Sequence, residues 1–204
     1  MTEALQTQQL LTASPLGLRI PRRIMPRRWR RKKGGAQPGA GPEKGDALRI
    51  LLAAFDSKGY AELICDGLHV SPEMVAMTYR NIGLERLVLI TDSMAAAGFP
   101  DGDYNIAGSP AIVRDGIART QDGALAGSTL SLVLAVENLA RFCNISISDA
   151  LVCATLNPAA ELGVSDQVGE LKRGARADIL LASIDESAKK LRVDRVFVGG
   201  KEVE

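Results

Sequence analysis

Residues 87–98, LVLITDSMAAAG, carry a carboxylate at a position suited to chemistry. The first five residues are apolar or β-branched, which is typical of a short strand buried on both faces, and Asp92 follows them directly. A parallel barrel presents its catalytic acid or base at the carboxyl end of such a strand. Asp92 is therefore a candidate general acid or base; the alternative is that it only caps a turn or the next helix.

A second polar group, Asp66 and His69, follows the strand expected at residues 60–65. Neighbouring parallel strands lie about 4.8 Å apart, so side chains at their carboxyl ends can face one pocket together with Asp92. A carboxylate and an imidazole placed there could share general acid–base work. The alternative is that His69 is a hydrogen-bonded structural residue.

The sequence LAGS at residues 125–128 precedes a predicted helix and offers a third candidate site. Backbone N–H groups ahead of a helix can hold a phosphate or a sugar. Alternatively, small residues such as Ala126 and Gly127 only allow the chain to turn tightly.

These candidates need elements to position them, and the first two lie in a predicted βαβ unit. Ser71 as the N-cap and Pro72 at the first helical position predict the start of a helix, and Gly83 predicts its end. A strand on each side of this helix, within about 33 residues in all, makes one βαβ unit with a right-handed crossover.

The region after Asp92 has a different pattern. Residues 103–123 alternate as strands do, and Asp115-Gly116 and Asp122-Gly123 each predict a type I′ hairpin turn. Helical spacing then predicts a helix that ends near Phe142.

A second helix is predicted from Ser146 to Asn157, where Pro158 should stop it. From residue 168 onward the sequence predicts strands. One is expected at residues 177–181, and a hairpin at residues 193–203 turns at Gly199-Gly200.

The composition separates residues 1–48 from the rest of the 204-residue chain. These residues hold ten Lys/Arg and three Asp/Glu (+7), whereas residues 49–204 hold 15 and 21 (−6). The first part is basic and rich in Pro and Gly, which predicts a disordered leader. It could serve as a basic arm for nucleic acid or an anionic surface, as a presequence, or have no role.

The three cysteines are odd in number and lack C-x-x-C spacing, which predicts reduced thiols in a cytoplasmic protein. No run of 18 apolar residues predicts a membrane span. A chain with one histidine and no cysteine cluster is poorly equipped to hold a catalytic zinc or iron by itself.

Four motifs together resemble a known family. ELICDGLHVSPE, RLVLITDSMAAAGFPDGDY, the run VRDGIARTQDGALAGSTLSL and VGELKRGARADILL occur in this order. They resemble the N-acetylglucosamine-6-phosphate deacetylases of the amidohydrolase superfamily, and the similarity extends over residues 49–204.

The resemblance implies an α/β fold: the C-terminal part of a (β/α)8 TIM-type barrel of the metallo-dependent amidohydrolase kind, plus C-terminal strands of a small β-sandwich. Residues 49–165 would form the partial barrel, and residues 166–204 the sandwich strands. The strands before Asp66 and Asp92 would be the seventh and eighth of the barrel. Two barrel strands without their neighbours should leave open edges.

The resemblance also implies an activity, the hydrolysis of the N-acetyl amide of N-acetylglucosamine 6-phosphate in amino sugar catabolism. Asp92 matches the carboxylate that takes a proton from metal-activated water and passes it to the leaving amine. The residues that match substrate-contacting loops are Asp66, Gly67, Leu68, His69, Leu125, Ala126 and Gly127.

The family's divalent metal, zinc or iron, is held by a Glu and two His on earlier strands. This chain has none of these ligands, because His69 matches the histidine that contacts substrate. We therefore expect a C-terminal portion that is inactive alone and binds no stoichiometric metal. A homodimer is compatible with the complete enzyme, whereas neither a membrane nor nucleic acid is expected as a partner.

Three alternatives stay open at this level. The chain could belong to another amidohydrolase, such as a dihydroorotase-like enzyme or an N-acyl-amino-acid deacylase, because GELKRGARAD is shared across that superfamily. It could be a non-catalytic protein with a nucleic-acid-binding arm, whose affinity would fall steeply with salt. It could also be an interaction fragment that completes its barrel with a separately encoded front half.

Overall fold

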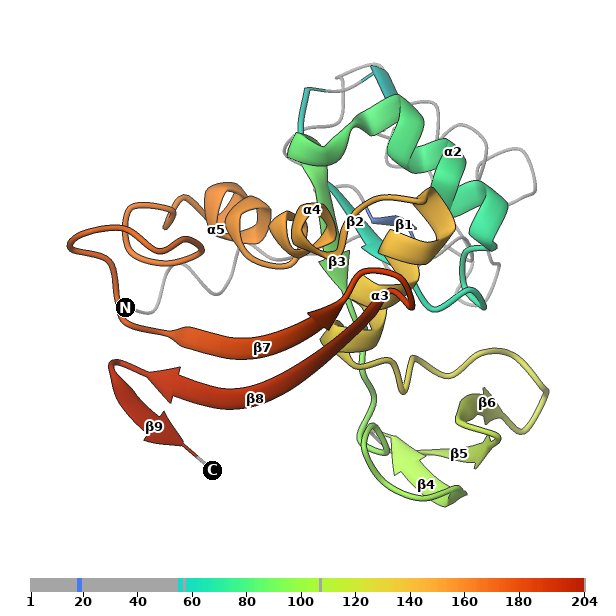
Figure 1. Ribbon diagram of the computed structural model, residues 1–204. Coiled ribbons are helices and arrows are strands. Elements are labelled where there is room, and N and C mark those ends of the chain that lie inside the picture. Colours follow the sequence, from blue (N-terminus) through green and yellow to red (C-terminus); the bar gives the residue numbers. More distant parts are fainter. Residues whose placement is uncertain (1–17, 20–54, 57, 107, 204) are drawn as a thin grey trace, which may run out of the picture.

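The computed structural model describes residues 18–19, 55–56, 58–106 and 108–203. In this part of the chain the strands form three sheets of three strands each, ordered β1-β2-β3, β4-β5-β6 and β7-β8-β9 (Figure 1). Four helices, α2 to α5, lie around the first sheet (Figure 1). None of the helices in the described ranges is long and apolar enough to cross a membrane.

The predicted βαβ unit is confirmed. Strands β2 (Ala61–Ile64) and β3 (Leu87–Ile90) pair in parallel, and α2 (Pro72–Ile82) connects them, followed by a short 3-10 turn, η2 (Leu84–Arg86). The Ser71 hydroxyl caps α2 by accepting a hydrogen bond from the Met74 N–H. Local capping chemistry thus sets the helix bounds that the sequence predicts.

The open edges predicted for the parallel pair are covered in part by other segments of the chain, although β3 stays an edge strand of its sheet. On one side, β1 (Leu18–Arg19) pairs antiparallel with β2. On the other side, the Leu89 N–H donates to the Cys153 carbonyl at 2.8 Å, and Asn157 Nδ2 donates to the Leu87 carbonyl at 2.7 Å. Unpaired edge groups cost free energy, and the chain satisfies these with its own segments. Apart from β1, the predicted leader, residues 1–48, lies outside the described residues.

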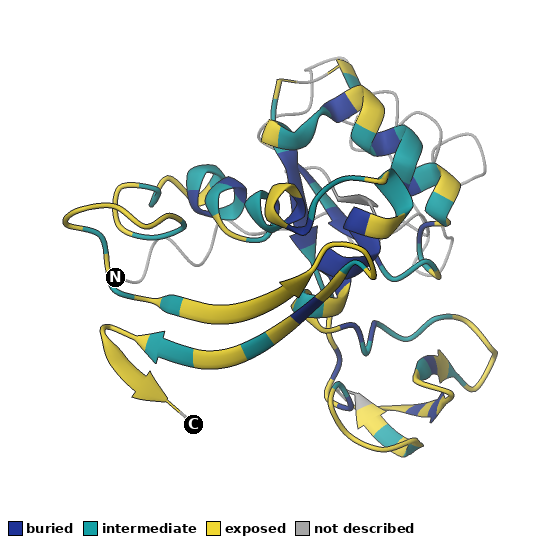
Figure 2. Cartoon of the chain, in the orientation of Figure 1, coloured by how far each residue is buried: buried dark blue, intermediate teal, exposed yellow. Residues whose placement is uncertain are grey.

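Helix α3 (Leu132–Cys143) lies at the centre of the molecule, where buried residues concentrate (Figure 2). Its inner face, including Val136 and Leu139, packs in one core with Leu63 of β2, Leu87 of β3 and Val75 of α2. This packing explains why the predicted helix forms: its apolar residues recur at helical spacing and leave water together.

The second predicted helix is two helices, so that prediction needs correction. Helix α4 (Ile147–Val152) ends before Cys153, and α5 (Leu156–Leu162) follows it. Pro158 is the third residue of α5, where a backbone N–H would lack an intrahelical acceptor in any case. The proline therefore fits the beginning of a helix, and the first helix ends earlier than the position of Pro158 suggested.

The second sheet confirms one predicted turn and corrects the other. It comprises β4 (Gly102–Ile106), β5 (Ser109–Arg114) and β6 (Ile117–Thr120). Asp115 and Gly116 both have positive φ, 52° and 70°, as a type I′ turn requires. At Asp122-Gly123 only the glycine has a positive φ, and the Thr120 N–H donates to the Ala124 carbonyl at 2.9 Å. This closes a three-residue loop of the kind that ends in a left-handed glycine.

The third sheet comprises β7 (Ile179–Asp185), β8 (Lys190–Val198) and β9 (Lys201–Val203), with the predicted turn at Gly199-Gly200 between the last two. One face is apolar, and its side chains Leu180, Val198 and Val203 are exposed. The opposite face carries ion pairs such as Arg195 to Glu202. The first strand begins at residue 179, two residues later than predicted, and runs further because β8 pairs along its length.

A buried carboxylate on α3 attaches the third sheet to the core. Glu137 is 6% exposed, its Oε1 accepts a hydrogen bond from the Leu191 N–H at 2.9 Å, and its Oε2 accepts one from Lys190 Nζ at 2.8 Å. Leu191 in turn belongs to the core that contains α3. Because both partners lie on β8, this contact joins the sheet to the helices.

Replacing Glu137 with alanine should lower the free energy of unfolding by about 1–3 kcal/mol, because the Leu191 N–H would be left without its acceptor. Burial alone would raise the pKa of Glu137, but the hydrogen bonds from Leu191 and Lys190 outweigh it and hold the pKa below its usual value. The carboxylate therefore stabilises the fold above the pKa of the unfolded chain. That contribution disappears as the pH falls through the lower pKa of the folded protein.

Urea unfolding at neutral and at strongly acidic pH measures this effect. Glu202→Ala, which removes an exposed partner of Arg195, is the control and should cost less. If Glu137→Ala lowers stability equally at both pH values, the carboxylate charge does not hold the sheet.

Candidate active site

The candidate group of Asp66 and His69 forms a closed turn at the end of β2, here called the Asp66 turn (residues 66–69). Asp66 Oδ1 accepts hydrogen bonds from the backbone N–H groups of Leu68 at 2.8 Å and His69 at 2.9 Å. His69 Nδ1–H donates to Asp66 Oδ2 at 2.6 Å. With the proton on Nδ1, the neutral ring keeps Nε2 as an acceptor that can face a ligand.

Burial and hydrogen bonding act in opposite directions on Asp66. Its side chain is 8% exposed and that of His69 is 12% exposed. Burial alone would raise the pKa of Asp66, but the His69 ring and the two backbone N–H groups outweigh it and hold the pKa below its usual value. Asp66 is therefore an anion that orients the imidazole, which is the role of a carboxylate that supports a functional histidine.

Asp92 follows β3 at the same edge of the sheet. Because Ile64 pairs with Ile90 in parallel register, Asp66 and Asp92 each lie two residues beyond the last pair. Asp92 is partly buried and has φ of 50°, in the left-handed region that aspartate tolerates better than most residues. The chain therefore turns sharply at Asp92. The structure confirms that the carboxyl ends of two neighbouring parallel strands deliver Asp66 and Asp92.

The third candidate, residues 125–127, lies directly beside the Asp92 backbone. The Ser128 N–H donates to the Asp92 carbonyl at 3.0 Å, and the Met94 N–H donates to the Ser128 carbonyl at 2.9 Å. Gly127 has φ of +76°, and a Cβ there would lie 3.2 Å from the Met94 Cβ and 3.4 Å from the backbone carbonyl oxygen of Asp92. Glycine thus permits this close approach, and the loop pairs through its backbone with residues 92–94, here called the Asp92 segment.

Leu68 is half exposed, and the other loop residues are half-buried and held by contacts within the protein. Leu125 forms an isolated antiparallel β-bridge with Arg119 of β6, and the Ala126 N–H donates to the Ala118 carbonyl at 3.0 Å. Gly67, with φ of +77°, packs towards Phe142 of α3, whose Cζ would lie 3.4 Å from a Cβ at that position. All the sequence-predicted residues therefore lie in three connected segments, the Asp66 turn, the Asp92 segment and the 125–128 loop.

Sequence reasoning missed the residues that support these segments. Asn138 Nδ2 of α3 donates to the Cys65 carbonyl next to Asp66 at 2.8 Å, and Ser93 Oγ donates to the Leu130 carbonyl at 3.0 Å. A polar residue among the mostly apolar residues of a predicted helix was the only local sign of Asn138.

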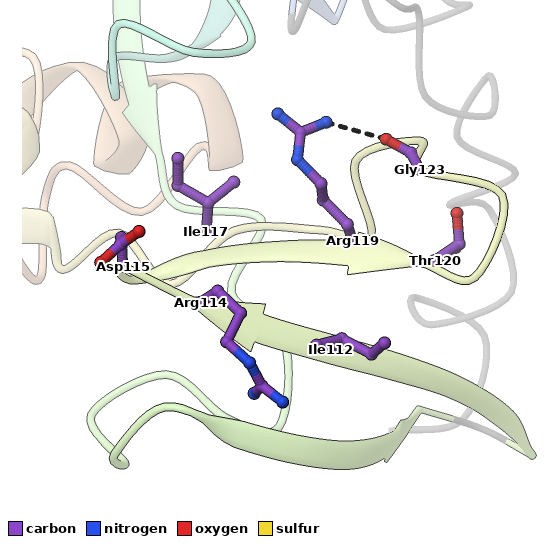
Figure 3. Close-up of a pocket in the computed structure, with 7 residues that line it drawn as sticks. All are labelled: Ile112, Arg114, Asp115, Ile117, Arg119, Thr120 and Gly123. Carbon is purple, nitrogen blue, oxygen red and sulfur yellow. Dashed lines mark hydrogen bonds between the residues drawn. The ribbon is translucent and has the colours of Figure 1, made fainter.

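A shallow cavity of about 350 Å³ lies elsewhere, on the exposed face of β5 and β6 (Figure 3). Its wall includes Arg114 and Arg119, whose guanidinium groups point in different directions in Figure 3. Arg114 pairs with Asp103 at 3.1 Å, and Arg119 Nη1 donates to the Gly123 carbonyl at 2.8 Å. None of the predicted site residues lines this cavity.

The described residues of this chain do not fit a zinc or iron site. Its one histidine is engaged by Asp66, and the described residues contain no group of three or more His, Cys, Asp or Glu that could hold a metal. Burial raises the pKa of Cys143 to about 11 and that of Cys153 to about 12, and it raises the pKa of Cys65 further. Neutral thiols are poor metal ligands, because the thiolate is the binding form.

The chain is similar to proteins of a known family. The model of the amidohydrolase family matches residues 45–203. N-Acetylglucosamine-6-phosphate deacetylase of Vibrio furnissii is 39% identical over 131 residues, which are 64% of this chain and 33% of that protein. A short relative from Escherichia coli K12, provisionally named as an N-acetylgalactosamine-6-phosphate deacetylase, is 39% identical over 146 residues, 72% of this chain and 84% of its own length.

A crystal structure of N-acetylglucosamine-6-phosphate deacetylase from Thermotoga maritima is 39% identical and superimposes with a TM-score of 0.62, over 69% of this chain and 37% of that chain. This chain therefore spans about a third of the length of the Vibrio and Thermotoga proteins. The likeness supports an α/β fold of the amidohydrolase, TIM-barrel-like kind. On the extent of the family match and on these relatives, the chain belongs to the amidohydrolase family.

Proposed function

We propose that this chain contributes the sugar-contacting and proton-transferring part of an amino-sugar 6-phosphate deacetylase, with N-acetylglucosamine 6-phosphate as the substrate. One observation carries the proposal: the Asp66–His69 pair and Asp92 follow the carboxyl ends of the neighbouring parallel strands β2 and β3, and Gly127 packs against the Asp92 backbone. The names of the relatives include both the glucosamine and the galactosamine epimers, and the experiment below separates them.

The roles follow from the chemistry of amide hydrolysis. Water attacks the acetyl carbonyl carbon, the carbon–nitrogen bond breaks, and acetate and the free amino sugar phosphate leave. An amine leaves poorly unless it is protonated, so a single carboxylate that takes the proton of the water and returns it to nitrogen serves both steps. Asp92 is assigned this role, because it is the carboxylate at the end of the buried strand β3.

The Asp66 turn and the 125–128 loop are assigned to the sugar. With Nδ1–H bound to Asp66, His69 can accept a hydrogen bond from a sugar hydroxyl through Nε2. The N–H groups of Leu68 and Ala126 already donate within the protein, so their contacts with a sugar would use a carbonyl or the side chain. Gly67, Leu125 and Gly127 complete the assigned contacts.

Activation of water by zinc or iron requires ligands outside this chain, because its own residues do not fit such a site. We therefore expect purified residues 1–204 to show no deacetylase turnover and no stoichiometric zinc or iron. Metal analysis after gel filtration, together with an amine-release assay, tests this expectation. Clear turnover of N-acetylglucosamine 6-phosphate by the chain alone would overturn it.

The function itself is tested in a chimaera. Residues 61–203 replace the corresponding part of the Thermotoga deacetylase, to which this chain is 39% identical. We expect turnover of N-acetylglucosamine 6-phosphate with a higher kcat/KM than for the galactosamine epimer, and the unaltered Thermotoga protein is the control. A folded, metal-loaded chimaera that hydrolyses neither substrate would contradict the proposal.

The finer architecture is also proposed. We assign β2 and β3 as the seventh and eighth strands of a (β/α)8 barrel, and β7 to β9 as one half of a β-sandwich. The parallel pairing of β2 with β3 and the exposed apolar face at Leu180, Val198 and Val203 support these assignments. The domain limits at residues 48 and 165, the homodimer and the cytoplasmic location stay predictions. Apart from β1, the basic segment of the nucleic-acid-binding alternative lies outside the described residues.

A further inference from the structure

Two side chains of α3, Asn138 and Phe142, contact the Asp66 turn. Asn138 is 3% exposed, and its Nδ2 donates to the Cys65 carbonyl, the peptide group that leads into Asp66. Phe142, one helical turn further along α3, packs against Gly67. The helix therefore contacts the turn on both sides of the Asp66 residue.

Arg141 orients the side-chain amide of Asn138. One of its guanidinium nitrogens donates to Asn138 Oδ1, which leaves Nδ2 to face the Cys65 carbonyl. The same guanidinium lies 5.4 Å from the centroid of the Phe142 ring. Because an amide has one donor end and one acceptor end, a cation at Oδ1 favours the orientation in which Nδ2 donates to the turn.

The beginning of α3 is tied to the Asp92 side of the site. The N-cap of α3, Ser131, follows Leu130 directly. The Leu130 carbonyl accepts a hydrogen bond from Ser93 Oγ, and the Leu130 N–H donates to Ser128 Oγ at 2.9 Å. The chain is thus tied to the Asp92 segment one residue before the N-cap of α3, and to the Asp66 turn at the last two turns of the helix.

We infer that Asn138 is a positioning residue, which sets the orientation of the His69 ring relative to Asp92 through the Cys65 carbonyl. Its meaning for catalysis rests on the proposed function, but its effect on His69 does not. Removal of the amide leaves a buried carbonyl without this donor at the residue before Asp66, and the Asp66 turn then keeps only the Phe142–Gly67 contact with α3.

His69 is the only histidine in the sequence, so it gives one set of imidazole signals in the NMR spectrum of the full chain. The ¹⁵N shifts report which ring nitrogen carries the proton, and the wild type should show the Nδ1–H form that Asp66 accepts. In Asn138→Ala we expect a several-fold fall in the ratio of this form to the Nε2–H form. Asn138→Asp, which keeps the size but lacks the N–H donor, should behave in the same way.

Asn157→Ala is the matched control. Asn157 is also a buried amide, 4% exposed, whose Nδ2 donates to the carbonyls of Leu84 and Leu87, away from the Asp66 turn. This variant should lose stability and leave the His69 signals unchanged. A change of the tautomer ratio in Asn157→Ala as large as in Asn138→Ala would overturn the inference.

Arg141→Ala keeps the inference testable if Asn138→Ala fails to fold. It removes the cation that orients the amide, and we expect a smaller fall of the same ratio. Unchanged His69 signals in the folded variants at Asn138, or in Arg141→Ala if those do not fold, would show that α3 does not position the ring. The measurement needs no substrate, so an inactive chimaera would overturn the proposed function and leave this result intact.

Discussion

In the chimaera that carries residues 61–203, replacing Asp92 with asparagine will lower kcat by about 10²–10⁴-fold, the usual contribution of a positioned general acid–base group. Asparagine keeps the size of the side chain but has no carboxylate to take a proton from water. It also cannot return a proton to the leaving nitrogen. The loss should therefore appear in kcat, with KM changed much less, because sugar contacts lie on the Asp66 turn and the 125–128 loop.

Asp103→Asn is the control for this experiment. Asp103 lies on β4, pairs with Arg114 and is 77% exposed, so its substitution should leave kcat unchanged. Activity is measured by amine release at saturating N-acetylglucosamine 6-phosphate, with metal content determined for every protein. If Asp92→Asn turns over at the rate of the unsubstituted chimaera, another group transfers the proton.

Replacing Glu161 with glutamine should stabilise the chain at alkaline pH. Glu161 lies on α5, and its Oε1 is buried without a hydrogen-bond partner. Burial, with a smaller contribution from the nearby Glu62, raises the pKa of Glu161 to about 7. An unpartnered carboxylate at this position therefore costs free energy whenever it is ionised.

The direction of the pH dependence follows from this raised pKa. Below the ordinary pKa of about 4.3 the group is protonated in both the folded and the unfolded chain, and its charge costs nothing. As the pH rises towards 7, the unfolded chain ionises first, and stability falls. Above pH 7 the full cost is present. Because solvent reaches part of the side chain, we expect Glu161→Gln to gain about 1–2 kcal/mol there.

Urea unfolding of the wild type and Glu161→Gln between acidic and alkaline pH tests this prediction. Glu170→Gln is the control, because Glu170 is exposed and paired with Lys172. The two curves should converge at acidic pH and separate as the pH rises. A constant difference between them, or a variant that is less stable at alkaline pH, would show that ionisation of Glu161 does not destabilise the fold.

Local patterns in the sequence were enough to predict several elements. The Ser71 cap, the proline after it and Gly83 defined α2, and the apolar run before Asp92 defined β3. These predictions succeeded because the responsible interactions join residues only a few positions apart. The predictions of a type I′ turn at Asp122-Gly123 and of one continuous helix up to Asn157 were wrong for the opposite reason. There, the pairing of the residues on either side of the loop and the packing of the helices decided the local conformation.

The residue types at the candidate site, Asp66, His69 and Asp92, were determined by the sequence alone, together with their places at the ends of strands. Only the tertiary structure decided the register of β2 with β3 and the contact of Gly127 with the Asp92 backbone. It also revealed Asn138, whose partner Cys65 lies 73 residues away in the chain. Contacts at that separation depend on how helices and strands pack, because no pattern within a few residues encodes them.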